Sequence, residues 1–114
     1  MIVRLPGLHP TRSRAVVHGG VVHAVAVADA KVASTYEQTR RALADLDATL
    51  AAAGTAKSRL LTCVVYIADM QQKPEMNRAW DEWADRACPP MRACVGATLQ
   101  GDSLVEIVAT AALP

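Results

Sequence analysis

The nine-residue run from Leu60 to Ala68 is the feature that most constrains how this chain folds. It is apolar and rich in β-branched side chains, polar residues flank it, and Asp69 ends it. A run of this length and composition predicts a β-strand rather than a helix. We expect this strand to lie in the interior of a sheet, so other segments must supply its neighbours.

A hairpin near the N-terminus is predicted to supply the first of these neighbouring strands. Residues 15–18 and 21–25 are apolar runs on either side of Gly19-Gly20, the kind of two-residue loop that a type I′ or II′ turn requires. A helix over residues 34–53 follows. Ser34 and Glu37 have the spacing of a capping box, leucines recur at helical intervals, and Gly54 supplies a stop.

A second helix is predicted to open at Pro74 and to end before Pro89-Pro90. Its apolar face would carry Trp80 and extend to Ala87. Strands over 91–98 and 104–112 complete a β-β-α-β-α-β-β order. This order predicts a single α+β domain over residues 1–114, in which two helices cover one face of the sheet.

Composition indicates an oligomer, because hydrophobic residues make up 52% of a chain of 114 residues. A domain this small buries a limited share of its own surface, so other subunits are expected to cover part of it. The formal net charge of +1 argues against nucleic-acid or membrane partners. No apolar stretch fits a signal peptide or a membrane span, so we expect a cytoplasmic protein. Three cysteines without CxxC spacing indicate neither disulfides nor a zinc site, and we expect no metal.

Arg92 and Glu106 are the candidate chemical groups, because each is set among apolar residues in a predicted strand. Such charges either pair with a partner or await a ligand. The guanidinium of Arg92 matches a carboxylate bidentately, and Glu106 could serve as a general base. A structural ion pair is the alternative for each. If the last two strands formed a plain hairpin, the two residues would lie about 17 Å apart. Cys94 has no nearby base, so we expect no nucleophilic role for it.

Several segments together resemble the RidA (YjgF-type) family of enamine/imine deaminases, from about residue 13 to residue 112. The segments that carry the resemblance are Tyr66 to Met70, Met76-Asn77 with Trp80, Pro90-Met91-Arg92-Ala93-Cys94, and Val105-Glu106-Ile107. The resemblance implies a chorismate-mutase-like mixed sheet, in which the strand at 60–68 separates the last two strands. It also implies a homotrimer with ligand clefts between adjacent subunits.

The same resemblance implies roles for individual residues. Arg92 would hold a substrate carboxylate, the backbone beside Ala93 and Cys94 would contact ligand and water, and Glu106 would help that water attack. The expected reaction is hydrolytic deamination of 2-imino or enamino acids, such as 2-iminobutanoate or 2-iminopropanoate, to 2-oxo acids and ammonia. No cofactor is expected, because the imine is already electrophilic. Asn77 is expected to be a buried residue whose hydrogen bonds tie the second helix to a loop.

Two positions depart from the family pattern. Family members usually have Tyr where this chain has Arg12, and Ser-Gly-Gln where it has Val25-Ala26-Val27. We therefore expect Val25 and Ala26 to line an altered pocket wall, and Arg12 to favour a larger or more acidic ligand. The altered wall also favours a second hypothesis, a trimer that binds a small carboxylate metabolite, or is regulated by one, without turnover. Ribonuclease activity is a third and is disfavoured by the near-neutral charge.

Overall fold

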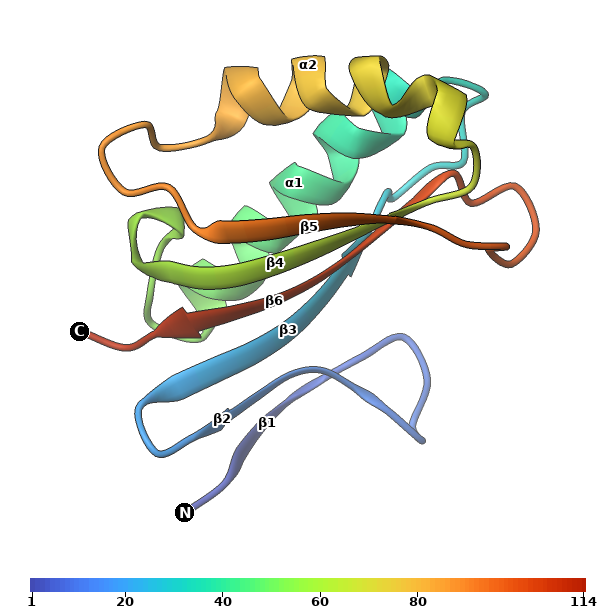
Figure 1. The fold of residues 1–114 in the computed structure, drawn as a ribbon. Coiled ribbons are helices and arrows are strands. Elements are labelled where there is room, and N and C mark those ends of the chain that lie inside the picture. Colours follow the sequence, from blue (N-terminus) through green and yellow to red (C-terminus); the bar gives the residue numbers. More distant parts are fainter.

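The computed structural model describes all 114 residues as one six-stranded sheet with two helices on one of its faces (Figure 1). The strands are β1 (Val3–Pro6), β2 (Ser13–His18), β3 (Val21–Val27), β4 (Leu60–Ile67), β5 (Met91–Gly96) and β6 (Val105–Ala112). The helices are α1 (Thr35–Ala52) and α2 (Lys73–Trp83), with 3-10 turns at Lys57–Arg59 and Met70–Gln72. The predicted fold class is confirmed, with a β-β-β-α-β-α-β-β order.

The strand order, β1-β2-β3-β6-β4-β5, confirms that β4 is an interior strand. It pairs in parallel with β5 and antiparallel with β6, so the sheet is mixed. The last two strands therefore do not form a hairpin. The chain-terminal strand β6 also pairs with β3, so it lies between the N-terminal and the central parts of the sheet.

The additional strand, β1, was not predicted from the sequence. Its four residues pair antiparallel with β2, and the register shifts between Leu5 and Pro6. The segment is short, largely exposed and ended by a proline, and therefore lacks the alternation that marks a strand. The predicted hairpin that follows is confirmed. Gly19 and Gly20 both have positive φ, 59° and 78°, as a type I′ turn requires.

The first helix begins where its capping residue predicts. Ser34 has extended backbone and its hydroxyl accepts the Glu37 N–H, while Gly54 lies just beyond the end of the helix with φ of 88°. The second helix ends four residues before Ala87, earlier than predicted, and Ala87 is exposed. Ala84 is already extended, and the Asp85 carboxylate accepts the Ala87 N–H. This local bond competes with another helical turn.

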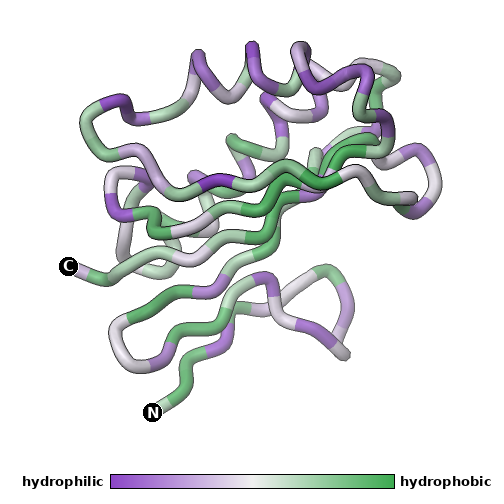
Figure 2. The backbone as a smooth tube through the Cα atoms, in the orientation of Figure 1, coloured by the Kyte–Doolittle hydropathy of each residue, from purple (hydrophilic) through white to green (hydrophobic).

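The core lies between the sheet and the helices. Side chains that alternate along the strands, such as Val65 and Ile107, face the helices, and Leu46 of α1 faces the sheet; all three are fully buried. Figure 2 shows the central strands as the most hydrophobic part of the chain. The opposite face has no helix over it. Apolar side chains on that face remain exposed, including Val25, Val95 and Val108. Neither helix combines the length and apolar character needed to cross a membrane.

Gln38 joins α1 to two loops from inside the core. Its side chain is 0% exposed, and its amide nitrogen donates to the carbonyls of Val32 and Asp102 at 2.8 and 2.9 Å. Its amide oxygen accepts the Leu104 N–H at 2.8 Å. A buried side-chain amide is held in place when its polar atoms have hydrogen-bond partners, as these three bonds provide. Gln38 thus holds the segment that leads directly into β6.

Candidate functional site

Arg92 lies on β5, at the edge of the sheet nearest α2. It is level with Cys63 of β4, so its side chain points to the helix-covered face. There the guanidinium lies over the Trp80 ring, with its carbon 5.2 Å from the ring centroid, and Nη1 lies 3.7 Å from the Met76 sulfur. Met76 and Trp80 are four residues apart on α2, so they lie on the same face of that helix. One helix face and one edge strand thus position this arginine.

The guanidinium of Arg92 has no acidic partner in the chain. The four ion pairs all involve Arg40, Arg41 or Arg78. An aromatic face and a thioether are weak partners for a group with five N–H donors. Arg92 is half-buried, and its strongest donors therefore remain free for a planar acceptor. A carboxylate is the acceptor that fits this group best.

The cysteines near Arg92 are not activated for nucleophilic chemistry. Burial raises the pKa of the Cys63 thiol to about 11, although the adjacent Arg92 charge acts in the opposite direction. Cys63 is therefore a protonated thiol at neutral pH. Cys94 lies two residues along β5, half-buried and level with Val65. No His or carboxylate donates to or accepts from its side chain.

Glu106 lies on the other face of the sheet. It is level with Tyr66 of β4 and Val27 of β3, on the side without helices. Two strand spacings and three residues along β4 separate it from Arg92, which corresponds to about 14 Å between Cα atoms. Glu106 is half-buried and forms no ion pair. A single chain therefore does not bring Arg92 and Glu106 together.

The remaining predicted site residues lie in separate places. Ala93 and Val25 are exposed on the same face as Glu106. Ala26 faces the core and is 1% exposed, so its side chain cannot touch a ligand, contrary to the predicted pocket lining. The strand alternation that exposes Val25 buries Ala26. Arg12 lies in the loop between β1 and β2, beyond the opposite edge of the sheet from Arg92.

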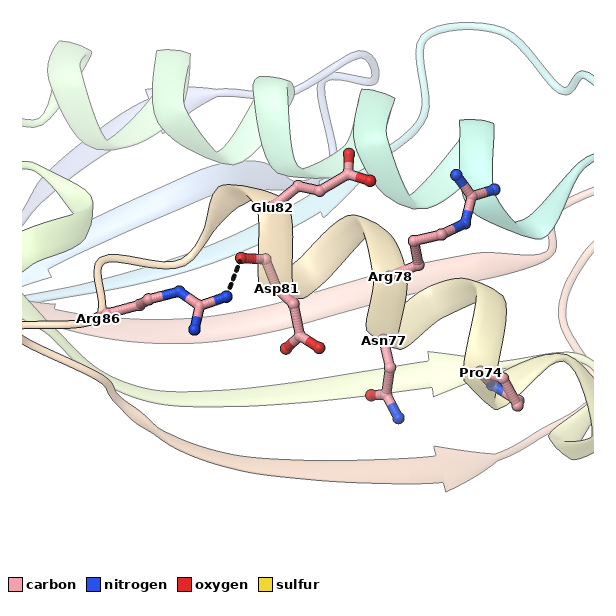
Figure 3. Close-up of a pocket in the computed structure, with 6 residues that line it drawn as sticks. All are labelled: Pro74, Asn77, Arg78, Asp81, Glu82 and Arg86. Atoms are coloured by element: carbon pink, nitrogen blue, oxygen red, sulfur yellow. Dashed lines mark hydrogen bonds between the residues drawn. The ribbon is translucent and has the colours of Figure 1, made fainter.

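A polar hollow of about 590 Å³ lies on the outer side of α2, and Figure 3 shows its lining. Its lining holds two basic and two acidic side chains, so its formal charge is balanced. Arg78 pairs with Glu75 at 2.8 Å and stacks on the Tyr36 ring, whose hydroxyl donates to Glu82. Asn77 projects from the helix towards β5, and its buried Oδ1 has no partner. The prediction that Asn77 tied the helix to a loop is therefore wrong.

Two residues that form the surroundings of Arg92 were not predicted from the sequence. Met76 and Trp80 were assigned to the resemblance and to core packing, and both are indeed buried. Their contact with Arg92 depends on α2 crossing over β5, which no local pattern reveals. The available signal was their spacing of four residues on a helix that precedes β5.

Comparisons with known proteins agree with the fold. The family model described as endoribonuclease L-PSP matches residues 11–113. A RutC family protein from Haemophilus ducreyi is 39% identical over 114 residues, which cover 99% of this chain and 97% of that protein. The RutC family protein YoaB from Escherichia coli is 34% identical over 102 residues, covering 89% of this chain and 90% of YoaB.

Solved structures give the same picture. The crystal structure of a YjgF family member from Neisseria meningitidis matches with a TM-score of 0.94 and 34% identity. The match covers 100% of this chain and 96% of that one. The fold of this chain is thus similar to that of a YjgF family member over nearly the full length of both chains.

Proposed function

This chain belongs to the family described as endoribonuclease L-PSP, together with RutC and YjgF family proteins. We propose that it is an enzyme that acts on small carboxylates. Its reaction would be the hydrolysis of reactive 2-imino and enamino acids to 2-oxo acids and ammonia. The observation that carries this proposal is the half-buried guanidinium of Arg92, which has only a ring and a thioether for partners. A substrate carboxylate would satisfy its free donors.

In this mechanism the protein contributes positioning and charge stabilisation. Arg92 would clamp the carboxylate, and the backbone beside Ala93 and Cys94 would hold a water near the C=N carbon. That water adds to the imine carbon, and the resulting amino alcohol expels ammonia to leave the 2-oxo acid. Glu106 would accept a proton from the water and return it to the nitrogen, which leaves as ammonia. No cofactor enters the scheme.

The proposal requires an assembly, because Arg92 and Glu106 lie on opposite faces of the sheet in one chain. We expect a homotrimer whose subunits bury the apolar face that the helices leave open, with a cleft between each pair of neighbours. Exposed valines on that face favour such a contact. Light scattering at micromolar concentration should give the mass of three chains. The mass of one chain would rule out a site formed between subunits.

Binding and chemistry can be tested separately. Arg92→Ala should weaken binding of 2-oxobutanoate by about 2 to 4 kcal/mol in calorimetry, because it removes a charge-assisted bidentate contact. Arg86→Ala is the matched control, since Arg86 is exposed on the outer side of α2. Unchanged affinity in Arg92→Ala would make Arg92 a structural residue.

Turnover is measured by generating imines with an amino-acid oxidase and following release of the 2-oxo acid. The wild-type protein should accelerate the release. Glu106→Gln should lower the rate about 10²-fold while 2-oxobutanoate binding persists. A full rate per trimer in this variant would remove Glu106 from the mechanism.

A second candidate function is carboxylate binding without turnover. It is favoured by the segment Val25–Val27, which presents apolar side chains to the open face where the family usually has polar ones. Under this proposal the wild-type protein binds 2-oxobutanoate through Arg92 but leaves the imine hydrolysis rate unchanged. The description of the family model as an endoribonuclease has little support in this chain, since 12 basic and 11 acidic residues nearly balance.

A further inference from the structure

The loop between β1 and β2 forms a second hollow, of about 520 Å³, that the proposed mechanism does not use. Arg4, His9 and Arg12 line it, together with the hydroxyl-bearing Thr11 and Ser13. No acidic side chain contributes to this lining. The hollow is thus rich in hydrogen-bond donors and carries two permanent positive charges.

Acidic residues are absent from the whole N-terminal part of the chain. Residues 1–28 contain three arginines and no Asp or Glu. Residues 29–114 therefore hold nine basic and eleven acidic residues, since the totals are 12 and 11. None of the four ion pairs involves Arg4 or Arg12, and the Arg12 side chain donates its one hydrogen bond to the Thr11 hydroxyl, at 3.2 Å. The positive potential at this end of the molecule is therefore not neutralised.

The backbone holds this loop in a defined shape. The Gly7 N–H donates to the Arg12 carbonyl, and the Arg12 N–H donates to the His9 carbonyl, each at 3.3 Å. A Cβ atom on Gly7 would lie only 2.8 Å from the Arg12 oxygen, so this close approach requires glycine. The base of the Arg12 side chain is therefore fixed, which lowers the entropy cost of holding a ligand there.

This hollow lies at the opposite edge of the sheet from Arg92. Figure 1 shows β1 and its loop far from β5 and α2, and five strand spacings separate the two edge strands, about 24 Å. A small ligand cannot bridge that distance within one chain. In a head-to-tail ring whose copies met through these two edges, however, the β1 edge of one copy would face the β5 edge of the next. The two cationic places would then border the same cleft.

We propose that the hollow at Arg12 binds a second anionic group of the ligand whose first carboxylate binds Arg92 of the neighbouring copy. The substrate class would then be 2-imino dicarboxylates, with 2-oxo dicarboxylates as products. This inference rests on the proposed function and specifies the substrate of that same site. A monocarboxylate leaves the Arg12 side of the cleft with an unmatched charge, whereas a dicarboxylate matches both guanidinium groups.

The test compares two ligands that differ by one carboxylate, 2-oxoglutarate and 2-oxobutanoate, by calorimetry at low ionic strength. Wild-type protein should bind 2-oxoglutarate at least tenfold more tightly, and the ratio should shrink as salt is added. Arg12→Gln should reduce the ratio to within about twofold, and Arg12→Lys should retain most of it because it keeps the charge. Arg86→Gln, which removes an exposed charge elsewhere, should leave the ratio unchanged.

Each alternative outcome has a distinct meaning. An equal affinity of the wild-type protein for the two ligands, or an unchanged ratio in Arg12→Gln, would overturn the assignment and leave the proposed function standing. If the wild-type protein shows no dicarboxylate preference and Arg12→Gln loses binding of inorganic phosphate, the hollow is a site for free phosphate and the proposal is overturned. An oligoribonucleotide that binds through Arg12 with no such preference would also overturn it. Unchanged 2-oxobutanoate affinity in Arg92→Ala would refute the proposed function itself.

Discussion

Replacing Gln38 provides a direct test of how the core positions β6. In Gln38→Met the volume is nearly kept, but three hydrogen bonds are lost. The Val32 carbonyl keeps its bond from Ser34, and Asp102 is exposed to water, so each of these losses should cost about 0.5 to 1 kcal/mol. The Leu104 N–H loses its partner in partly buried surroundings, which costs about 1 to 3 kcal/mol. We expect a total of about 2 to 5 kcal/mol.

A second substitution at this position separates shape from hydrogen bonding. Gln38→Glu keeps an acceptor for Leu104 but turns a carboxylate oxygen towards the carbonyls of Val32 and Asp102. The ionised form is disfavoured there, so the folded protein would hold the proton to a higher pH than the unfolded chain, where Glu titrates near 4.3. Stability is then kept below about pH 4 and lost as the pH rises, by up to about 4 kcal/mol at pH 7.

The assay is urea unfolding followed by the fluorescence of Trp80 and Trp83, at one protomer concentration because association contributes to stability. Gln71→Met is the control, since Gln71 is exposed and its side chain forms no hydrogen bond. The reasoning would be refuted by a loss below about 1 kcal/mol in Gln38→Met. It would equally be refuted by a Gln38→Glu variant with the same stability at pH 4 and pH 7.

Three further predictions follow from buried or tightly packed groups. Because burial raises the pKa of Cys63 from 9.0 to about 11, the free energy of unfolding should be full below pH 9 and fall by on the order of 2 to 3 kcal/mol through pH 11. Denaturant titrations at a series of pH values should show a weaker dependence of stability on pH in Cys63→Ala. Gly7→Ala should push the Arg12 carbonyl away and lower the melting temperature by several degrees in a calorimetric scan, and an unchanged value would mean the loop relaxes freely. Trp83→Phe should cost about 1 kcal/mol in urea unfolding through loss of the 2.8 Å bond from Nε1 to Asp47, whereas Asp47→Asn, which keeps an acceptor, should cost less.

The elements with local signals were predicted well. Gly19-Gly20 needs only its own positive φ angles to make a turn, and Ser34 needs only its own hydroxyl to begin a helix. β1 lacked such a signal, because its pairing partner supplies the reason for its extended shape. The end of α2 was misplaced because a single side chain, Asp85, competes with the helix for one N–H group.

The candidate site was predictable only in part. Arg92 was identified from its apolar surroundings, and the structure gives it no acidic partner. Its position relative to Glu106 depends on the order of the strands and on which face of the sheet each strand residue occupies. Only the assembled sheet defines both. Ala26 illustrates the same point, since shifting the register by one residue would exchange its burial with that of Val25. Residue types could be read from the chain, whereas the faces they occupy could not.

The place of β6 between β3 and β4 has a consequence for biosynthesis. The strand that joins the two parts of the sheet is translated after the other five. Until Val105–Ala112 has been translated, β3 and β4 both present unpaired backbone edges, which are templates for aggregation. The sheet is therefore expected to complete only after Ala112 has been translated. Truncation before Val105 should leave two half-sheets rather than a slightly shortened protein.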